Sequence, residues 1–302
     1  GVERLIINDP ALALASLRTG KLDIYGATTT VVPHSDVPEV QKISGVTVVR
    51  FRPWRTGENI VGRLDEEPWS NIKVRQAISL AIDREGWRDA WFPGGDLVSG
   101  PIPLISAGAV RLEEMPEDVR QYYEYNPRRA RELLAEAGYP DGLDVKLYTT
   151  SGYGPDYISR TELLKDLLAR VGIRAAIEVQ EYSLWIKDTY RGDYHGLVHI
   201  PGWSLGHEDE WLGAYTKGNT RNHVHIDDPE VTGIVNSFRS APSPEEAQRQ
   251  LRAFVENFHQ NLWRVFLPQG VYVEAHFDYV QNYAPKATYD HGKRIEVVWL
   301  NK

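Results

Sequence analysis

Residues 143–200 read LDVKLYTTSGYGPDYISRTELLKDLLARVGIRAAIEVQEYSLWIKDTYRGDYHGLVHI. Within this stretch, residues 144–149, 173–179 and 196–200 have the apolar and β-branched content of strands. The segments between them, residues 156–171 and 183–190, read as helices. Such β-α-β-α-β alternation favours right-handed crossovers and an α/β sheet, so the stretch predicts an α/β fold.

Helix and strand signals continue on both sides of this stretch. Apolar residues at i, i+3, i+4, i+7 and i+8 predict a helix that contains residues 74–82. Asn126, Pro127 and Gly138 are typical of an N-cap, a first helical position and a helix end. The other expected helices begin near residues 10, 83, 229 and 244, and the other expected strands are residues 4–7, 22–25, 45–51, 271–273 and 295–299.

Composition excludes several classes of protein. The chain has 302 residues, of which 42% are hydrophobic, enough for a large core. Its net charge of −8 argues against a nucleic-acid binder, which needs a concentrated basic surface. Cysteine is absent, which removes disulfides, cysteine nucleophiles and thiolate metal sites. The 9 Trp and 16 Tyr residues can form core or stack on a ligand.

The beginning of the chain does not read as a signal peptide. Gly1-Val2-Glu3-Arg4-Leu5 lacks a basic start, a long apolar stretch and a small-residue cleavage site, and no Met opens the sequence. No apolar run in the sequence approaches the roughly 18 residues of a membrane span. We therefore expect a chain that is processed or is a piece of something longer.

The sequence offers little evidence for catalysis. Residues 207–210, His-Glu-Asp-Glu, contain metal-ligand types, but no second His follows at helical spacing, which favours a polar loop or ligand rim. His223 and His225 are expected on an exposed polar strand. A Gly-x-Ser-x-Gly elbow, a phosphate loop and a dinucleotide fingerprint are all missing. We therefore expect no enzyme, no cofactor and no metal.

Five motifs occur in order along the chain. They are residues 10–24 (PALALASLRTGKLDI), residues 68–84 (PWSNIKVRQAISLAIDR), residues 125–139 (YNPRRARELLAEAGY), Gly202-Trp203 after a buried strand, and residues 228–231 (DPEV). Together they resemble the extracellular solute-binding proteins (family 5) of ABC importers for dipeptides, oligopeptides and nickel. The resemblance covers nearly the whole chain.

The resemblance implies a periplasmic-binding-protein-like fold of type II, in which two α/β lobes close on a ligand. It assigns residues 1–64 to the end of the N-terminal portion of lobe I, residues 65–270 to a complete lobe II, and residues 271–302 to the C-terminal return into a partial lobe I. The family's long N-terminal portion has no counterpart here. We therefore expect a C-terminal fragment that lacks half of the cleft and binds ligand weakly or not at all.

The resemblance also implies a function in capture. It indicates the substrate-binding component of an ABC importer, which takes up peptides or similar small solutes outside the membrane and docks on a membrane permease after closure. The expected location is periplasmic or extracytoplasmic, with a lipid anchor through the missing part left open, and the full-length protein is expected to be a monomer. An oligosaccharide-binding protein of the same family and a solute-sensing domain remain as alternatives.

The family motifs place Trp203 and Tyr153 in the cleft. The predicted ligand-contact residues are Trp203, Tyr153, Ser204, Gly206, His207, Asp209 and Trp211.

Two departures from the family pattern argue against strict dipeptide recognition. Where dipeptide binders hold the ligand amino group with an Asp, this chain has Gly206, and near their carboxylate-binding Arg it has Ser151. Each such charge-assisted contact is worth roughly 1.5–3 kcal/mol. Asp209 lies three residues after Gly206 and offers a carboxylate in place of the missing Asp, so peptides remain among the expected ligands. A sugar would instead use the flat rings of Trp203, Trp211, Tyr153 and Trp185, although Trp185 also fits a packed helix face.

Overall fold

The computed structural model describes residues 1–7, 9–26, 31–285 and 295–302. The α-helices are α1 Pro10–Arg18, α2 Val37–Val40, α3 Ile72–Leu80, α4 Arg84–Trp91, α5 Glu117–Arg120, α6 Pro127–Glu136, α7 Pro155–Ala169, α8 Tyr182–Arg191, α9 Glu208–Gly213, α10 Pro229–Arg239 and α11 Pro244–Asn261. The strands are β1 Ile24–Tyr25, β2 Val46–Phe51, β3 Asn59–Val61, β4 Leu143–Thr150, β5 Ile173–Gln180, β6 Leu197–Ile200, β7 Val265–Phe266, β8 Tyr272–Phe277, β9 Val280–Gln281 and β10 Trp299–Leu300. In the described part of the chain, no helix has the length and apolar character that a membrane crossing requires.

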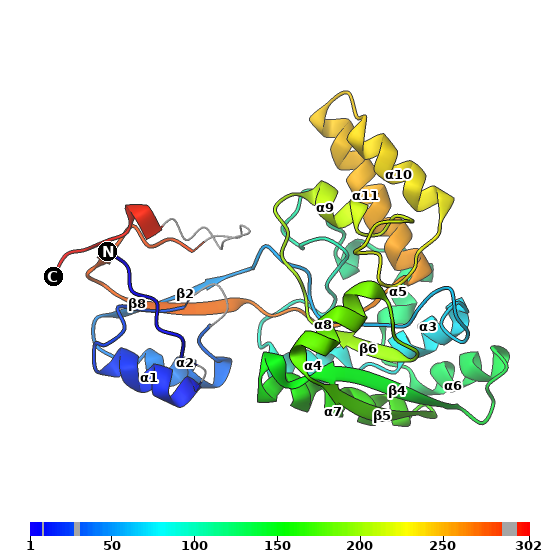
Figure 1. The fold of residues 1–302 in the computed structure, drawn as a ribbon, viewed down its shortest axis with the longest axis horizontal. Helices are drawn as coiled ribbons and strands as arrows, with labels where there is room; N and C mark the ends of the chain where they lie inside the picture. Colours follow the sequence, from blue (N-terminus) through cyan, green and yellow to red (C-terminus); the bar gives the residue numbers. More distant parts are fainter. Residues whose placement is uncertain (8, 27–30, 286–294) are drawn as a thin grey trace. The chain divides into compact units, whose positions relative to one another are not determined.

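The chain divides into two compact units, which are described separately (Figure 1). Unit 1 comprises residues 1–54, 89–95 and 270–302, and unit 2 comprises residues 55–88 and 96–269. All the residues that the sequence predicts to contact ligand belong to unit 2.

Unit 2 is built on a five-stranded sheet in the order β5-β4-β6-β3-β7. β4 runs parallel to β5 along its whole length and parallel to β6, whereas β3 is antiparallel to both β6 and β7. The helices α7 and α8 connect β4 to β5 and β5 to β6 (Figure 1). The predicted β-α-β-α-β unit and the α/β fold class are confirmed.

Local sequence signals explain where the helices of unit 2 begin. Asn71, Asn126, Asp228 and Ser243 each accept a hydrogen bond from a backbone N–H of the first helical turn, at 2.8 to 3.2 Å. These side chains satisfy donors that the helix itself leaves free. α3 packs against α6, and α10 packs against α11.

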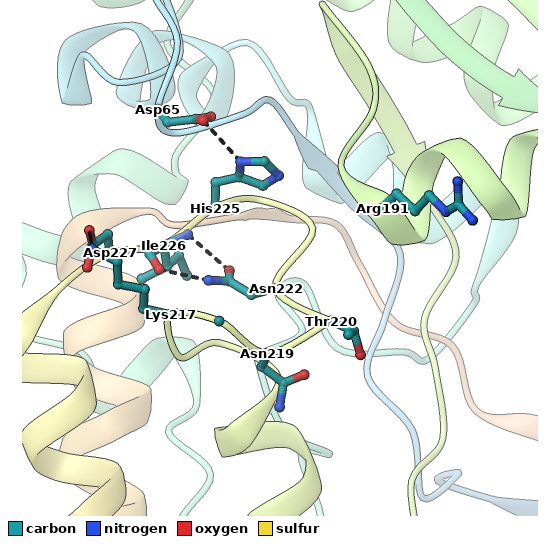
Figure 2. Close-up of a pocket in the computed structure, with 10 residues that line it drawn as sticks. Asp65, Arg191, Lys217, Asn219, Thr220, Asn222, His225, Ile226 and Asp227 are labelled. Atoms are coloured by element: carbon teal, nitrogen blue, oxygen red, sulfur yellow. Dashed lines mark hydrogen bonds and ion pairs between the residues drawn. The ribbon is translucent and has the colours of Figure 1, made fainter.

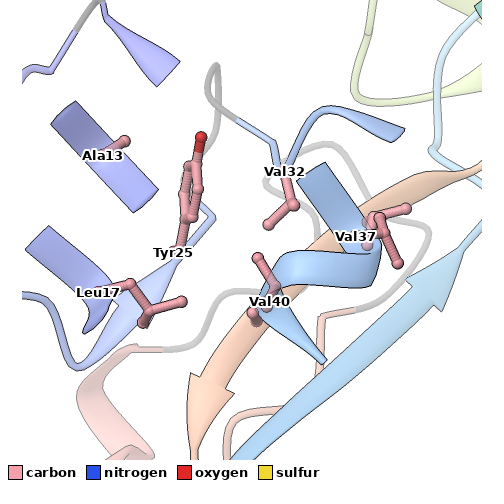
Figure 3. Close-up of a cluster of buried hydrophobic side chains, with 8 residues drawn as sticks. Ala13, Leu17, Tyr25, Val32, Val37 and Val40 are labelled. Carbon is pink, nitrogen blue, oxygen red and sulfur yellow. The ribbon is translucent and has the colours of Figure 1, made fainter. Parts of the chain in front are cut away.

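Unit 1 contains a three-stranded antiparallel sheet in the order β1-β8-β2. The central strand β8 pairs with β2 over six residues and with β1 over two. Beside this sheet lies a buried cluster, part of which Figure 3 shows, consisting of Ala13, Leu17, Tyr25, Val32, Val37, Val40, Val273 and Ala275. The Asp9 carboxylate caps α1 by accepting from Ala11 N–H at 2.8 Å.

Two of the predicted strands, residues 4–7 and residues 295–299, are wrong. Residues 4–7 have no regular structure, and Ile6 is almost fully exposed. Residues 295–297 form a 3₁₀ turn, and only Trp299–Leu300 pairs, with β9. An apolar or β-branched run becomes a strand only where its backbone groups find a partner strand, and the pattern itself does not supply one.

Candidate functional site

The carboxyl ends of three parallel strands meet at one edge of the unit 2 sheet. β4 ends at Thr150, β5 at Gln180 and β6 at Ile200. Open α/β sheets bind their ligands outside this edge. The chain leaves the three strands through segments that carry large aromatic side chains, and we call four of these side chains the aromatic edge: Tyr153, Tyr182, Tyr190 and Trp203.

Tyr153 lies in the turn between β4 and α7. It is 40% exposed, and its ring packs edge-on against Tyr182 and Trp185, with centroids 5.5 and 5.8 Å away. Gly152 is needed before it, because a Cβ at that position would lie 2.4 Å from the Tyr182 ring. Burial raises the pKa of the Tyr153 phenol, so the hydroxyl keeps its proton and can donate a hydrogen bond to a ligand.

Trp203 is fixed by the backbone of the segment that precedes β3. Its N–H donates to the Thr56 hydroxyl at 3.1 Å, and its carbonyl accepts from Thr56 N–H at 3.0 Å. Gly202 permits this approach, since a Cβ there would lie 1.7 Å from the Thr56 carbonyl oxygen. The half-buried Trp203 ring packs against His223 and Tyr190, with centroids 5.1 and 6.4 Å away. The Gly-Trp pair therefore anchors an aromatic surface at the end of β6.

A buried ion network links the start of β3 to α7 and β6. Arg160 donates to both oxygens of Glu58, at 2.7 and 3.0 Å, and His199 Nε2 lies 3.2 Å from Glu58 Oε2. Burial alone would raise the pKa of Glu58, but Arg160 and His199 outweigh it and hold that pKa at about 2. On its other side, His199 Nδ1 lies 2.9 Å from the Thr161 hydroxyl.

The order Thr161-His199-Glu58 is that of a nucleophile, a base and an orienting acid. Thr161 and His199 are completely buried, however, and the Thr161 hydroxyl donates to the Tyr157 carbonyl at 3.0 Å. The Tyr157 ring stacks on His199 at 4.4 Å. The network therefore serves packing and charge balance in unit 2.

The predicted ligand contacts after β6 have mixed surroundings. His207 caps α9, with Nδ1 accepting from Asp209 N–H at 3.2 Å. Asp209 pairs with Arg239 at 2.6 Å, so binding a ligand ammonium there would compete with that pair. Gly206 is exposed and Ser204 is half-buried. In the described part of the chain, no three His, Cys, Asp or Glu side chains are grouped to hold a metal ion.

Two tryptophans considered as ligand platforms lie inside unit 2. Trp211 is 0% exposed and Trp185 is 1% exposed. A ring without exposed surface cannot stack on a ligand, so a ligand contact at Trp211 does not fit this structure. For Trp185, the packed helix face is the interpretation that fits.

The expectation for His223 and His225 is wrong. They lie in a turn, not a strand, and they do not share an exposed face. His223 is buried, whereas His225 has a left-handed φ of 59° and its Nδ1 lies 3.0 Å from Asp65 Oδ2. Long-range contacts, which the alternating pattern does not report, decide both positions.

Unit 2 also has an open polar pocket of about 510 Å³ (Figure 2). Several of its polar groups are paired with one another: Asn222 bonds the backbone of Ile226 in both directions, and Lys217 pairs with Asp227 at 2.5 Å. The residues that line it are Asp65, Arg191, Lys217, Gly218, Asn219, Thr220, Asn222, His225, Ile226 and Asp227. None of the predicted ligand contacts lies among them.

Sequence reasoning missed two members of the aromatic edge and the arginine beneath it. Tyr182 follows β5 as Tyr153 follows β4, so the rule that ligands bind at carboxyl ends of strands could have found it. Tyr190 is 38% exposed near the end of α8. Arg264, which packs under Trp203, has no local sequence signal.

Comparison with known proteins identifies relatives of this chain. Residues 1–222 match the bacterial extracellular solute-binding proteins, family 5 Middle. The chain is 29% identical over 210 residues to di/tripeptide-binding protein 1 of Pseudomonas aeruginosa, covering 66% of this chain and 37% of that protein. It is 25% identical over 276 residues to heme-binding protein A of Haemophilus influenzae, covering 85% of this chain and 47% of that protein. The chain thus spans less than half the length of these curated relatives.

Solved structures share the fold. The periplasmic binding protein DppA from Helicobacter pylori, in complex with the peptide STSA, superposes with a TM-score of 0.80 at 22% identity, over 98% of this chain and 56% of that one. The oligopeptide-binding protein AppA from Bacillus subtilis, in complex with a nonapeptide, gives 0.79 at 21% identity, over 98% and 60%. These matches confirm the periplasmic-binding-protein-like fold. The chain belongs to the bacterial extracellular solute-binding proteins of family 5.

Proposed function

We propose that the protein is the substrate-binding component of an ABC importer and captures peptides or similar small solutes outside the cytoplasmic membrane. The aromatic edge of unit 2 is the surface that contacts the ligand. Tyr153, Tyr182 and Tyr190 keep 38 to 43% of their surface exposed although they are large apolar side chains, and Trp203 is half-buried beside them. Exposed aromatic groups that converge at the carboxyl ends of parallel strands are the observation that supports this proposal.

The relatives support the same class of ligand. The Pseudomonas aeruginosa relative is named for di- and tripeptides, and the two structural neighbours hold peptides of different lengths. An aromatic surface recognises a peptide through its backbone and apolar side chains and tolerates sequence variation.

Three further points belong to the proposal. Unit 2 corresponds to lobe II of the family, and unit 1 holds segments of lobe I. Capture proceeds by closure of two lobes, after which the closed form docks on a membrane permease. The protein acts in the periplasm or an equivalent extracytoplasmic space.

An oligosaccharide is the second candidate ligand. It is favoured by Gly206 and Ser151, which stand where dipeptide binders of the family carry charged groups for the peptide ends. Neutral sugars need aromatic faces and hydrogen-bonding groups and little charge.

Ligand identity is tested on the protein as its gene encodes it, purified without refolding and then denatured. Mass spectrometry of the released small molecules is expected to find peptides. Release of oligosaccharides would replace the leading proposal with the alternative, and release of neither from a preparation that also fails to bind added peptide would contradict both.

The site is tested by Trp203→Leu, with Trp299→Leu as the control. Trp299 is about half exposed and lies in unit 1. We expect Trp203→Leu to weaken peptide binding in calorimetry by at least about tenfold, which corresponds to about 1.4 kcal/mol. Trp299→Leu should bind as the unsubstituted protein does, and equal effects of the two variants would contradict the placement of the site.

A further inference from the structure

Arg264 lies directly before β7 and is only 2% exposed. Its guanidinium carbon is 5.3 Å from the centre of the Trp203 ring and 5.0 Å from that of Tyr215. Nη1 donates to Asn59 Oδ1 at 3.2 Å, and Nη2 donates to His223 Nε2 at 2.7 Å. A cation is thus held against the buried side of Trp203 by neutral groups.

Two other buried arginines in unit 2 show what a purely structural arrangement looks like. Arg75 donates to the carbonyls of Trp69, Ser70 and Asn261. Arg84 donates to three backbone carbonyls and to a serine hydroxyl. Each is surrounded by oxygen acceptors, whereas Arg264 has one amide oxygen and one imidazole nitrogen.

The charge of Arg264 is not neutralised locally. No carboxylate in the described residues lies within ion-pair distance of it. Burial and Arg264 itself lower the pKa of His223 well below its ordinary value, so His223 is neutral. Since Nε2 accepts from Arg264, the proton of His223 is on Nδ1, and that atom is buried without a hydrogen-bond partner.

Two further arginines act electrostatically on the tyrosines of the aromatic edge. Burial raises the pKa values of Tyr153 and Tyr190, and the cations that act against this rise are Arg55 at Tyr153 and Arg221 and Arg264 at Tyr190. Arg55 also donates to the Gly202 carbonyl beside Trp203.

Three carboxylates of unit 2 already have cationic partners. Glu58 is bound by Arg160, Asp209 by Arg239, and Glu210 lies 3.8 Å from Arg221. Glu208 accepts from the Ser106 hydroxyl at 3.0 Å. Arg264 is therefore a buried cation directly behind Trp203, whereas Asp209 and Glu210, which follow Trp203 in the chain, are already paired with arginines.

A cation against one part of an indole draws the π electrons toward itself. The exposed part of the Trp203 ring then attracts a second cation less and an anionic group more. We propose that Arg264 is a positioning residue that acts through Trp203 and sets the specificity of the aromatic edge for acidic peptides, in which a carboxylate lies near Trp203. This inference rests on the proposed function, because it names the class of peptide that the same surface selects.

The test is competition among peptides that differ only in charge. Alanine-based peptides of two to five residues, each made with one Glu, one Gln or one Lys, are mixed in equal amounts and dialysed against the protein as its gene encodes it. Mass spectrometry of the retained fraction is expected to show Glu peptides enriched about tenfold over Lys peptides, with Gln peptides between them. Arg264→Gln should reduce this ratio to below about threefold, and Arg264→Lys should keep most of it.

Arg75→Gln is the matched control, because it removes a buried guanidinium that packs on Trp263 and not on Trp203. It should leave the Glu-to-Lys ratio unchanged. Retention of peptides without charge preference, or a preference that survives Arg264→Gln, would overturn this inference and leave the proposed function standing. If the unsubstituted protein retains no peptide of any charge, the proposed function fails with it.

A second measurement needs neither a ligand nor a stable Arg264→Gln variant. The fluorescence of Trp203 is obtained as the difference between the unsubstituted protein and Trp203→Phe, and is quenched with iodide or with caesium. A positive potential at the ring should raise the ratio of iodide quenching to caesium quenching at least about twofold above the ratio for free N-acetyltryptophanamide, because the anion is concentrated there. A ratio equal to that of N-acetyltryptophanamide would contradict the proposed charge.

Discussion

The two units differ in the sequence distance over which their sheets are built. In unit 2, β4, β5 and β6 follow one another through short helical crossovers. In unit 1, the central strand β8 comes from the C-terminal part of the chain and pairs with β1 and β2 from the N-terminal part. Local connections cost less chain entropy than distant ones. We therefore expect unit 2 to be the more stable and earlier-folding unit.

The largest expected effect is a loss of unfolding free energy in unit 2, which would reduce its difference in stability from unit 1. Glu58→Gln removes the anion between Arg160 and His199 and with it the bidentate carboxylate that the buried Arg160 guanidinium binds. We expect unit 2 to lose about 3–5 kcal/mol of unfolding free energy, measured by urea denaturation followed through Trp fluorescence. A loss below about 1 kcal/mol would show that the network does not contribute to the difference between the units.

The same network predicts a pH dependence. The pKa of Glu58 is about 2 in the folded protein and 4.5 in its unperturbed state. A lowered carboxyl pKa stabilises the fold above the unfolded value, and this contribution is lost as pH falls from about 4.5 toward 2. We expect a loss of about 3 kcal/mol across this range. Glu58→Gln should show a correspondingly shallower acid transition, and an identical transition would argue against Glu58 as its source.

A pair of cavity substitutions compares the two cores directly. Leu17 in unit 1 and Leu164 in unit 2 are both completely buried, and each Leu→Ala change should cost about 3 kcal/mol. Because unit 1 has the smaller cluster, we expect Leu17→Ala to make residues 1–54 sensitive to limited proteolysis, whereas Leu164→Ala only lowers the thermal midpoint. Leu12→Ala, on the exposed side of α1, is the control and should be nearly neutral. Equal protease resistance in both variants would contradict the expectation that unit 1 is the less stable unit.

The smallest expected effect concerns the aromatic edge. In Gly152→Ala the new Cβ would collide with the Tyr182 ring, which must move away from Tyr153. We expect a cost of about 1–2 kcal/mol and a loss of peptide affinity several times larger than that of Gly233→Ala, which also lies in unit 2, meets open space and has no left-handed φ. Calorimetry with the co-purified ligand measures the affinity of both variants. Equal affinities would show that Tyr182 does not belong to the ligand-binding surface.

The parts of the fold that sequence could predict are those with local causes. Asn126, Pro127 and Gly138 mark a helix without reference to the rest of the chain, and the α7 and α8 crossovers follow from periodicity. Tyr153 and Trp203 could be predicted as site residues through family motifs, and their neighbourhoods show why glycines precede them. That they contact a ligand stays a prediction.

The rest depends on contacts between distant segments. The burial of Trp211, the turn at His223 and the position of Arg264 under Trp203 each require knowledge of which segments meet. The strand at residues 4–7 was predicted from composition alone, and in the described chain it has no neighbour to pair with.

The origin of β8 has a consequence during biosynthesis. β1 and β2 leave the ribosome long before β8 is made, and in the described residues β8 is the strand that both of them pair with. At about 5–20 residues per second, the nascent chain carries two unpaired strand edges for roughly 10 to 45 seconds. Unpaired edges invite association with other chains. A holdase chaperone, or export of the chain before it folds, would protect these edges until translation reaches residue 272.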